Sequence, residues 1–327
     1  MAERVVFHIG LMKSGTTFIQ GRLNANRARL AEQGILFPGP TWARHVRAVS
    51  DLMHSKNRKP GSWTSLAEEI NEHPGTAVVS MEYLAPMGAP RIAALRRSFP
   101  GTEIRVAVTV RDLGRSVPAM WQEALKNRRT WEWPEYVAAI RSGGDAGTRF
   151  WRQQHSGRIV RRWAAALGAD NVYVVTVPPP GAGGETLWER FGEVAGIAPS
   201  TWDEAPRANE SLGAASTLVL RELNLATEDL SLSAYKKRVK ALGKHVMGQR
   251  RRDEDPIGFV VPDWLRQESR RIRTQLERSG AHVVGDLGEL APLDVAGVDP
   301  TQVSEAAQRD AAVAALAGAL RQVRRIS

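Results

Sequence analysis

The stretch Val5-Val6-Phe7-His8-Ile9-Gly10-Leu11-Met12-Lys13-Ser14-Gly15-Thr16-Thr17-Phe18 decides the fold. It begins as an apolar run of strand composition, passes through a loop rich in glycine and hydroxyl side chains, and leads into a helical pattern. At such a turn the first N–H groups of the helix point at an anion, and the helix dipole favours negative charge there. A lysine adds a point charge, and hydroxyls add hydrogen-bond donors. The stretch therefore predicts an anion-binding loop that joins a strand to a helix.

Apolar segments of strand composition recur along the chain, and helical patterns separate them. Strands are predicted over residues 4–9, 76–80, 103–110 and 171–177. Helices are predicted over residues 16–33, 43–53, 90–99, from the third strand to about residue 129, and over 187–194; beyond Pro206 only helices are expected. The helix after the third strand should carry Pro118 near its first turn.

Strands that alternate with helices imply right-handed crossovers and a parallel sheet. We expect an α/β fold in which helices flank a central parallel sheet, as in a P-loop-like three-layer sandwich. Residues 1–212 are predicted to form this core, and residues 213–327 a mostly helical extension packed on it.

The composition of the 327 residues is that of an ordinary globular protein, with 43% hydrophobic and 24% charged residues. There is no cysteine, which excludes disulfides and cysteine-ligated metal. The first strand is expected almost at the start, and no signal peptide or bilayer-length apolar run is evident. These features favour a cytoplasmic protein.

The formal net charge of +10 is partly local. Residues 236–252 carry eight lysines and arginines and no acid. Such a run is compatible with nucleic acid, an anionic membrane or an acidic substrate, and equally with a solvated helix face. We expect no nucleic-acid partner, and a peripheral contact with an anionic membrane stays open.

A second polar segment, Arg111-Asp112-Leu113-Gly114-Arg115-Ser116, follows the third predicted strand. Ligands bind beyond the carboxyl ends of parallel strands, so Arg111 is expected on the same sheet edge as Lys13. A guanidinium there can hold a phosphate through two parallel hydrogen bonds. The loop itself differs from the ATP-binding pattern G-x-x-x-x-G-K-[ST], because Lys13 precedes Gly15 instead of following it.

The run Lys13-Ser14-Gly15-Thr16-Thr17 resembles the 5′-phosphosulfate loop of sulfotransferases that use 3′-phosphoadenosine 5′-phosphosulfate (PAPS). The segment after Arg111 is similar to the 3′-phosphate-binding element of that family, and residues 7–10, 174–178 and 187–191 look like its bacterial members. The resemblance spans about residues 5–212. Two positions depart from it: Met12 stands where the family commonly has proline, and Ala119 stands where it has a serine.

This resemblance implies PAPS as co-substrate, with no metal required. Lys13 would stabilise charge on the leaving phosphate, and Ser14, Gly15, Thr16 and Thr17 would hold its oxygens. Arg111 would hold the 3′-phosphate, and either Ser116 supplies the missing hydroxyl from a neighbouring turn or that contact is absent. Arg207, in a late loop, would close over the nucleotide.

A general base should take the proton of the acceptor. Glu82 follows the second predicted strand and should emerge on the ligand edge; the resemblance supports it, because family members with a glutamate near this point use it as the base. His45 is the rival, because histidine titrates near neutrality. His8, inside the first strand, is interpreted as a core histidine bonded to a neighbour.

Three functions remain open at this stage. The leading hypothesis is transfer of a sulfuryl group from PAPS to a hydroxyl, or as second choice an amine, of a small-molecule, carbohydrate or lipid acceptor. A P-loop phosphotransferase or kinase would need a lysine after the second glycine and an acid that holds Mg²⁺. A sulfotransferase-like binding protein without activity is the third.

Overall fold

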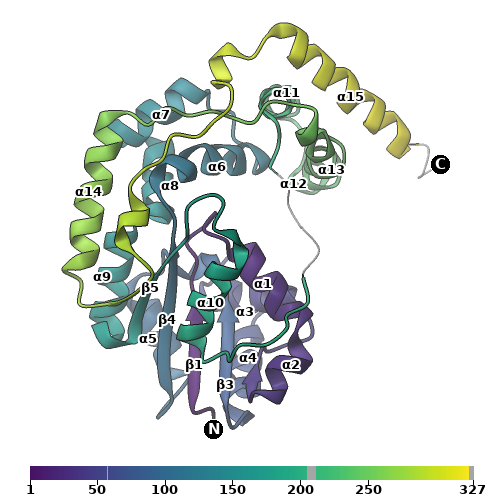
Figure 1. The fold of residues 1–327 in the computed structure, drawn as a ribbon. Coiled ribbons are helices and arrows are strands. Elements are labelled where there is room, and N and C mark those ends of the chain that lie inside the picture. The colour runs from purple at the N-terminus through teal and green to yellow at the C-terminus, as the bar shows by residue number, and fades with distance from the viewer. Residues whose placement is uncertain (57, 205–210, 324–327) are drawn as a thin grey trace. The chain divides into compact units, whose positions relative to one another are not determined.

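The computed structural model describes residues 1–56, 58–204 and 211–323, and at its centre is a six-stranded sheet (Figure 1). The strand order is β2-β3-β1-β4-β5-β6, and every pairing is parallel. The strands are β1 (Arg4–His8), β2 (Ile35–Leu36), β3 (Thr76–Ser80), β4 (Glu103–Val110), β5 (Val172–Thr176) and β6 (His282–Val284). The predicted fold class, an α/β fold with helices flanking a central parallel sheet, is confirmed.

The strands predicted from the sequence correspond to β1, β3, β4 and β5. The two edge strands, β2 and β6, were not predicted. β2 has two residues and β6 has three, which is too short for a periodic signal. β6 also lies in the region where only helices were expected, so that expectation was wrong. Its strand geometry comes from pairing with β5, Tyr173 opposite His282, and not from local propensity.

Helices supply the rest of the regular structure. The α-helices of the first 200 residues are α1 (Thr16–Ala25), α2 (Arg27–Glu32), α3 (Trp42–Leu52), α4 (Ser62–Glu72), α5 (Ala89–Arg97), α6 (Leu113–Lys126), α7 (Trp133–Ser142), α8 (Asp145–Gln154), α9 (Ser156–Leu167) and α10 (Gly183–Ala195). Those that follow are α11 (Ala214–Ala226), α12 (Leu232–Tyr235), α13 (Ala241–His245), α14 (Asp263–Glu277) and α15 (Glu305–Val323). A π-helical turn, Lys236–Lys240, joins α12 to α13. The 3₁₀ turns are Glu82–Leu84, Ala169–Asn171, Met247–Arg252, Leu287–Leu290 and Pro300–Gln302.

Two helix predictions need correction. The single helix expected over residues 16–33 is interrupted at Asn26, whose side-chain amide donates to the carbonyl of Arg22 at 2.8 Å. Asparagine competes for helix backbone in this way, which ends α1 one residue earlier. Pro118 is the sixth residue of α6 and not part of its first turn.

The chain folds into two compact units whose segments alternate along the sequence. The first comprises Met1–Asp112, Arg152–Pro206 and Gln267–Ala291, and it contains the whole sheet. The second comprises Leu113–Trp151, Arg207–Arg266 and Pro292–Ser327 and has no named strand among its described residues. The predicted boundary between a core over residues 1–212 and a helical extension over residues 213–327 stays a prediction.

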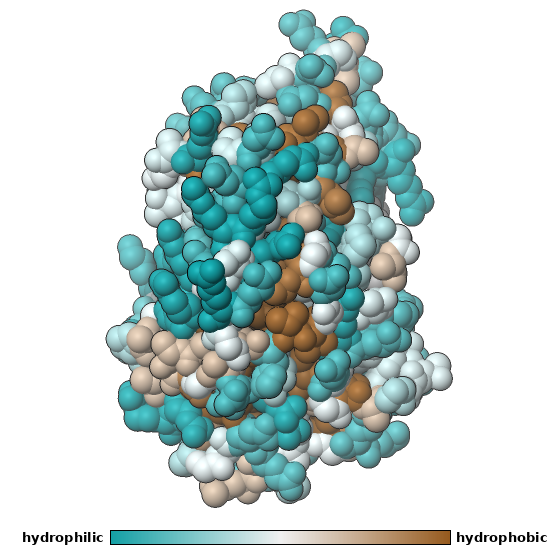
Figure 2. All heavy atoms as spheres, turned by 60° about the vertical axis from the view of Figure 1, so that its left-hand side comes forward, coloured by the Kyte–Doolittle hydropathy of each residue, from teal (hydrophilic) through white to brown (hydrophobic). Residues whose placement is uncertain are grey.

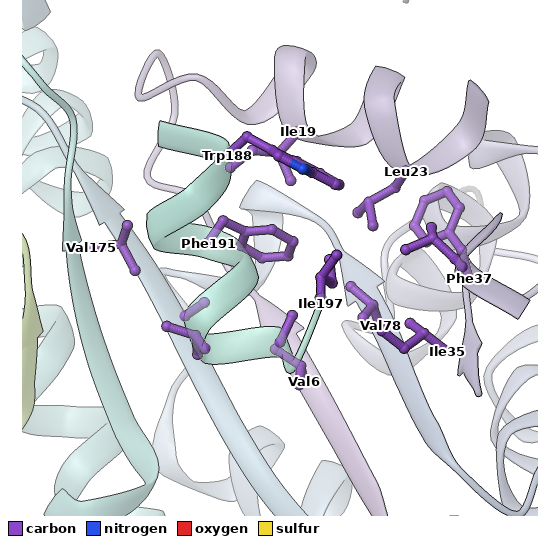
Figure 3. Close-up of a cluster of buried hydrophobic side chains, with 14 of the residues drawn as sticks. Val6, Ile19, Leu23, Ile35, Phe37, Val78, Val175, Trp188, Phe191 and Ile197 are labelled. Atoms are coloured by element: carbon purple, nitrogen blue, oxygen red, sulfur yellow. The ribbon is translucent and has the colours of Figure 1, made fainter. Parts of the chain in front are cut away.

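The core of the first unit lies between the sheet and helices α1 and α10 (Figure 3). Ile19 and Leu23 of α1 and Phe191 of α10 pack onto a sheet face that includes Val6 and Val78. Phe7 points to the opposite face, where its ring meets Phe99 at 5.7 Å, as the alternation of strand side chains requires. The strand is therefore apolar on both faces, as expected for a central parallel strand.

Arg22 joins α1 to α10. Its guanidinium binds both carboxylate oxygens of Glu185, at 2.8 and 2.5 Å, and lies over the ring of Phe18. Arg22 is almost fully buried, and its hydrogen bonds lower the pKa of Glu185. This bidentate pair fixes α1, and hence the loop before it, against α10.

Aromatic side chains fill the second unit. Trp121 is fully buried, packs against Trp133 at 5.1 Å between ring centres, and donates its indole N–H to the carbonyl of Trp131. Phe259 meets Trp133 edge-on. The basic residues at 236, 237, 238, 240, 244, 251 and 252 are exposed, whereas Tyr235 and Val239 turn inward.

Figure 2 shows one face of the molecule, on which hydrophilic side chains cover much of the surface and apolar ones gather in a band. Among the described residues, no helix is both long and apolar enough to cross a membrane.

Three histidines are buried in the first unit, and this predicts how its stability depends on pH. Burial lowers the pKa of His8 to about 3 and those of His45 and His155 to about 4. The unfolded chain takes up these protons near pH 6.5, so acid favours unfolding. We expect the free energy of unfolding to fall by about 5 kcal/mol from pH 6.5 to pH 5, in a window above the carboxylate titrations. Urea unfolding followed by tryptophan fluorescence measures this; a flat or opposite dependence would contradict it.

Candidate functional site

The loop after β1 leaves the sheet between the ends of its two neighbours. The N–H of Met81, just past β3, donates to the carbonyl of His8 at 2.9 Å. On the other side the N–H of Leu11 donates to the carbonyl of Thr109 in β4 at 2.7 Å. The loop therefore starts at the carboxyl edge of the sheet, where parallel α/β folds bind ligands.

Three residues of this loop have left-handed backbone conformations: Gly10 at φ 81°, Lys13 at φ 62° and Gly15 at φ 86°. For a residue with a side chain such as Lys13 this conformation costs roughly 1–2 kcal/mol and persists only where the surroundings enforce it. Gly10 is needed for a second reason, because a Cβ there would lie 2.8 Å from the Cβ of Glu82. The loop and the residue after β3 are thus in close contact.

Helix α1 presents an open N-terminus to this loop. Its N-cap is Gly15, which has no side chain to cap the first N–H groups, those of Thr16 and Thr17. Thr17 is exposed. The positive end of the helix dipole and these donors are therefore available to an anion beside Lys13.

The hydroxyls of Ser14 and Thr16 are directed differently from the sequence-based expectation. Ser14 Oγ donates to the carbonyl of Leu11 at 2.5 Å, and Thr16 Oγ1 donates to the same carbonyl at 3.0 Å. Both side chains are buried. They close the loop on itself through the carbonyl of Leu11.

Glu82 lies beside the loop, in the 3₁₀ turn that follows β3. It is half-buried, and Gln20 of α1 donates to its Oε2 at 3.2 Å and to the carbonyl of Ser80 at 3.3 Å. Gln20 thus ties the carboxylate to the helix whose N-terminus faces the loop. Glu82 is thus placed just past the carboxyl end of β3.

His45 lies in the core instead. It is fully buried, its Nε2 is 2.8 Å from the carbonyl of Pro38, and the N–H of Ser80 donates to its Nδ1 at 3.4 Å. Its ring also packs against Phe37. Both nitrogens are engaged by the backbone, so His45 holds β3 and the start of α3 together and does not fit a base that serves an acceptor.

Arg111 directly follows β4, and is half-buried. Because β1 pairs with β3 on one side and β4 on the other, Glu82 and Arg111 lie on opposite sides of the loop. Ser116 and Ala119 belong to α6, in the second unit, and Ser116 is buried. Arg207 is outside the described residues.

One supporting residue was not predicted from the sequence. Gln154, at the end of α8, is buried and donates to the carbonyl of Met12 at 2.8 Å. It thereby fixes the peptide that precedes Lys13. No motif or periodicity signals this contact, which joins residues 142 positions apart.

Within the described ranges, no cluster of three or more His, Asp or Glu side chains is placed to hold a metal ion.

Among solved structures, a sulfotransferase from Alicyclobacillus acidocaldarius matches 71% of this chain and 98% of its own, at 15% identity and a TM-score of 0.41. No protein-family model matches the chain, and neither does any curated protein.

The contact between Gly10 and Glu82 yields a prediction. Gly10→Ala adds a Cβ that overlaps the Glu82 Cβ and approaches its Cα to 3.2 Å, in addition to the left-handed strain. Gly34→Ala is the matched control, because Gly34 is also left-handed but a Cβ there would meet no atom within 4 Å. We expect about 1 kcal/mol of destabilisation for Gly34→Ala and about 1–3 kcal/mol more for Gly10→Ala. Denaturant unfolding compares them, and equal losses would contradict the close contact.

Proposed function

We propose that this protein is a PAPS-dependent sulfotransferase that transfers a sulfuryl group to an acceptor hydroxyl. The observation that carries the proposal is the convergence of three groups at one sheet edge. Lys13 with the open N-terminus of α1 follows β1, Glu82 follows β3, and Arg111 follows β4. A cation, an anion-binding helix end, a second cation and a carboxylate are what this reaction needs.

PAPS would supply the activated sulfuryl group, which leaves a nucleotide with phosphates at both its 5′ and 3′ positions. In such in-line displacements the protein contributes mainly positioning and charge stabilisation. Lys13 and the N–H groups of Thr16 and Thr17 are suited to hold the 5′-phosphate, where charge develops. The fit rests on the left-handed Gly15, which leaves those N–H groups without a side-chain cap.

Arg111 would hold the 3′-phosphate. It directly follows β4, across β1 from Glu82, and a planar guanidinium binds phosphate in a bidentate manner. Two separate phosphate-binding groups favour the bisphosphate nucleotide over ATP, whose phosphates form one continuous chain.

Glu82 is the general base in this proposal. Its carboxylate is half-buried beside the loop, and Gln20 orients it with a hydrogen bond. His45 is not retained in this role, because both its nitrogens are engaged in the core. The acceptor is proposed to be a small molecule, carbohydrate or lipid with a hydroxyl group.

The role of Lys13 is tested by binding and by transfer. We expect Lys13→Ala to lower the affinity for adenosine 3′,5′-bisphosphate about 10- to 100-fold, the loss of one charged hydrogen bond, and to abolish sulfuryl transfer. Calorimetry measures the affinity, and radiolabelled PAPS with a panel of hydroxyl acceptors measures transfer. Lys59→Ala, at an exposed lysine of the same unit, should change neither. Tighter binding of ATP–Mg²⁺ than of the bisphosphate would favour a kinase and overturn the proposal.

A Glu82 variant tests the rate of sulfuryl transfer separately from the affinity for the nucleotide. Glu82→Gln keeps the side chain's shape and an acceptor for Gln20 but removes the base. We expect transfer to fall about 10²- to 10⁴-fold, while the affinity for the bisphosphate stays within about twofold. Glu32→Gln, at an exposed acid of α2, is the control. Full transfer activity of Glu82→Gln would remove Glu82 from the mechanism but leave the donor assignment intact.

A further inference from the structure

A chain of buried polar groups runs beneath the anion-binding loop. Ser80 Oγ of β3 lies 2.8 Å from His8 Nδ1 of β1, and His8 Nε2 lies 3.1 Å from Thr109 Oγ1 of β4. Thr109 Oγ1 is 2.6 Å from Ser14 Oγ, which donates to the carbonyl of Leu11. Ser80, His8, Thr109 and Ser14 are at most 1% exposed. The chain crosses three strands and ends inside the loop.

The proton positions along this chain are fixed by counting donors. A carbonyl only accepts, so the single hydroxyl proton of Ser14 goes to Leu11. Thr109 must then donate its own proton to Ser14, and its oxygen must accept one from His8 Nε2. Burial keeps His8 neutral, so its Nδ1 carries no proton and accepts from Ser80. Only one direction of donation, from Ser80 through His8 and Thr109 to Ser14, therefore gives each hydrogen bond of the chain one donor and one acceptor.

We propose that Thr109 is a positioning residue for the anion-binding loop, because its hydroxyl is hydrogen-bonded to that of Ser14, which in turn donates to the carbonyl of Leu11. Leu11 O accepts from both Ser14 and Thr16, and the neighbouring residues include the left-handed Lys13. The chain therefore enforces the backbone that presents Lys13 and the first N–H groups of α1. The loop is ordered before the anion arrives, so binding does not bear that entropic cost.

This assignment extends the proposed function, on which its link to the nucleotide donor rests. The hydrogen-bond order is independent of that function, because it concerns a neutral His8 and two hydroxyls. Anion binding by the loop is also separable from donor identity, since inorganic pyrophosphate tests it without the nucleoside.

The experiment compares three threonine variants. Thr109→Val keeps the shape but removes the hydroxyl that donates to Ser14 and accepts from His8 Nε2. Thr109→Ser restores the hydroxyl. Thr102→Val is the matched control: within the part of the chain that the structure describes, the buried Thr102 Oγ1 has no hydrogen-bond partner, so its loss should be neutral or stabilising.

We expect Thr109→Val to lower the affinity for pyrophosphate and for adenosine 3′,5′-bisphosphate about tenfold, measured by calorimetry, which corresponds to about 1.4 kcal/mol. Thr109→Ser should restore most of it, and Thr102→Val should match the wild-type protein. In ¹⁵N NMR of the histidine-labelled wild-type protein, the imidazole of His8 should give the signature of the Nε2–H tautomer.

Each contrary result has its own meaning. Wild-type affinity in Thr109→Val, or a loss that Thr109→Ser does not recover, would overturn the positioning role. An Nδ1–H tautomer at His8 would overturn the hydrogen-bond order on which the role depends. Binding of pyrophosphate but not of the bisphosphate would remove the proposed donor while Thr109 keeps its role, and a wild-type protein that binds neither anion would overturn both.

Discussion

The central place of β1, hydrogen-bonded to β3 on one side and to β4 on the other, is the constraint on which the rest of the site depends. A strand enclosed in this way is largely apolar on both faces. The chain that follows it can leave the sheet only beyond the carboxyl end of the strand. The next helix must then begin within a few residues in order to cover the sheet. This forces a tight loop, and the left-handed Gly10, Lys13 and Gly15 provide the turns. Residues that follow the flanking strands, such as Glu82 and Arg111, become neighbours of the loop without any direct sequence relation to it.

The sequence predicted those parts of the molecule in which local pattern and tertiary structure agree. The strands β3 and β4 were predicted with their observed ends, because continuous apolar runs bounded by turns are unambiguous in a parallel sheet. The places of Glu82 and Arg111 in the chain could be predicted from these strands, since a residue just past a parallel strand must lie at the carboxyl edge of the sheet. The edge strand His282–Val284 could not be predicted, because three residues acquire their conformation from the partner strand alone.

Within the site, residue type was predictable but side-chain direction was not. The serine and threonine hydroxyls of the loop are suited to bind phosphate, yet Ser14 and Thr16 turn toward Leu11. The choice is made by the carbonyl of Leu11, which would otherwise lack partners in a buried loop, and an unsatisfied buried carbonyl costs about 1–3 kcal/mol. Gln154 fulfils the same need at Met12 from 142 residues away. Such requirements arise only after the chain has folded, so no spacing in the sequence records them.

The two histidines near the loop differ from the carboxylate of Glu82 in their burial. Burial makes His8 and His45 good scaffolds, because a neutral imidazole offers one donor and one acceptor at fixed angles. The same burial lowers their pKa to about 3 and about 4, so that neither imidazole binds a proton readily at neutral pH. A base must be able to hold the proton that it takes and must be reachable by the acceptor. Glu82 is half-buried and hydrogen-bonded on one side only among the contacts described, to Gln20, which orients the carboxylate without enclosing it. Of these three groups, the two imidazoles are removed from water and support the structure, while the carboxylate of Glu82 keeps part of its hydration and is the group that we propose as the base.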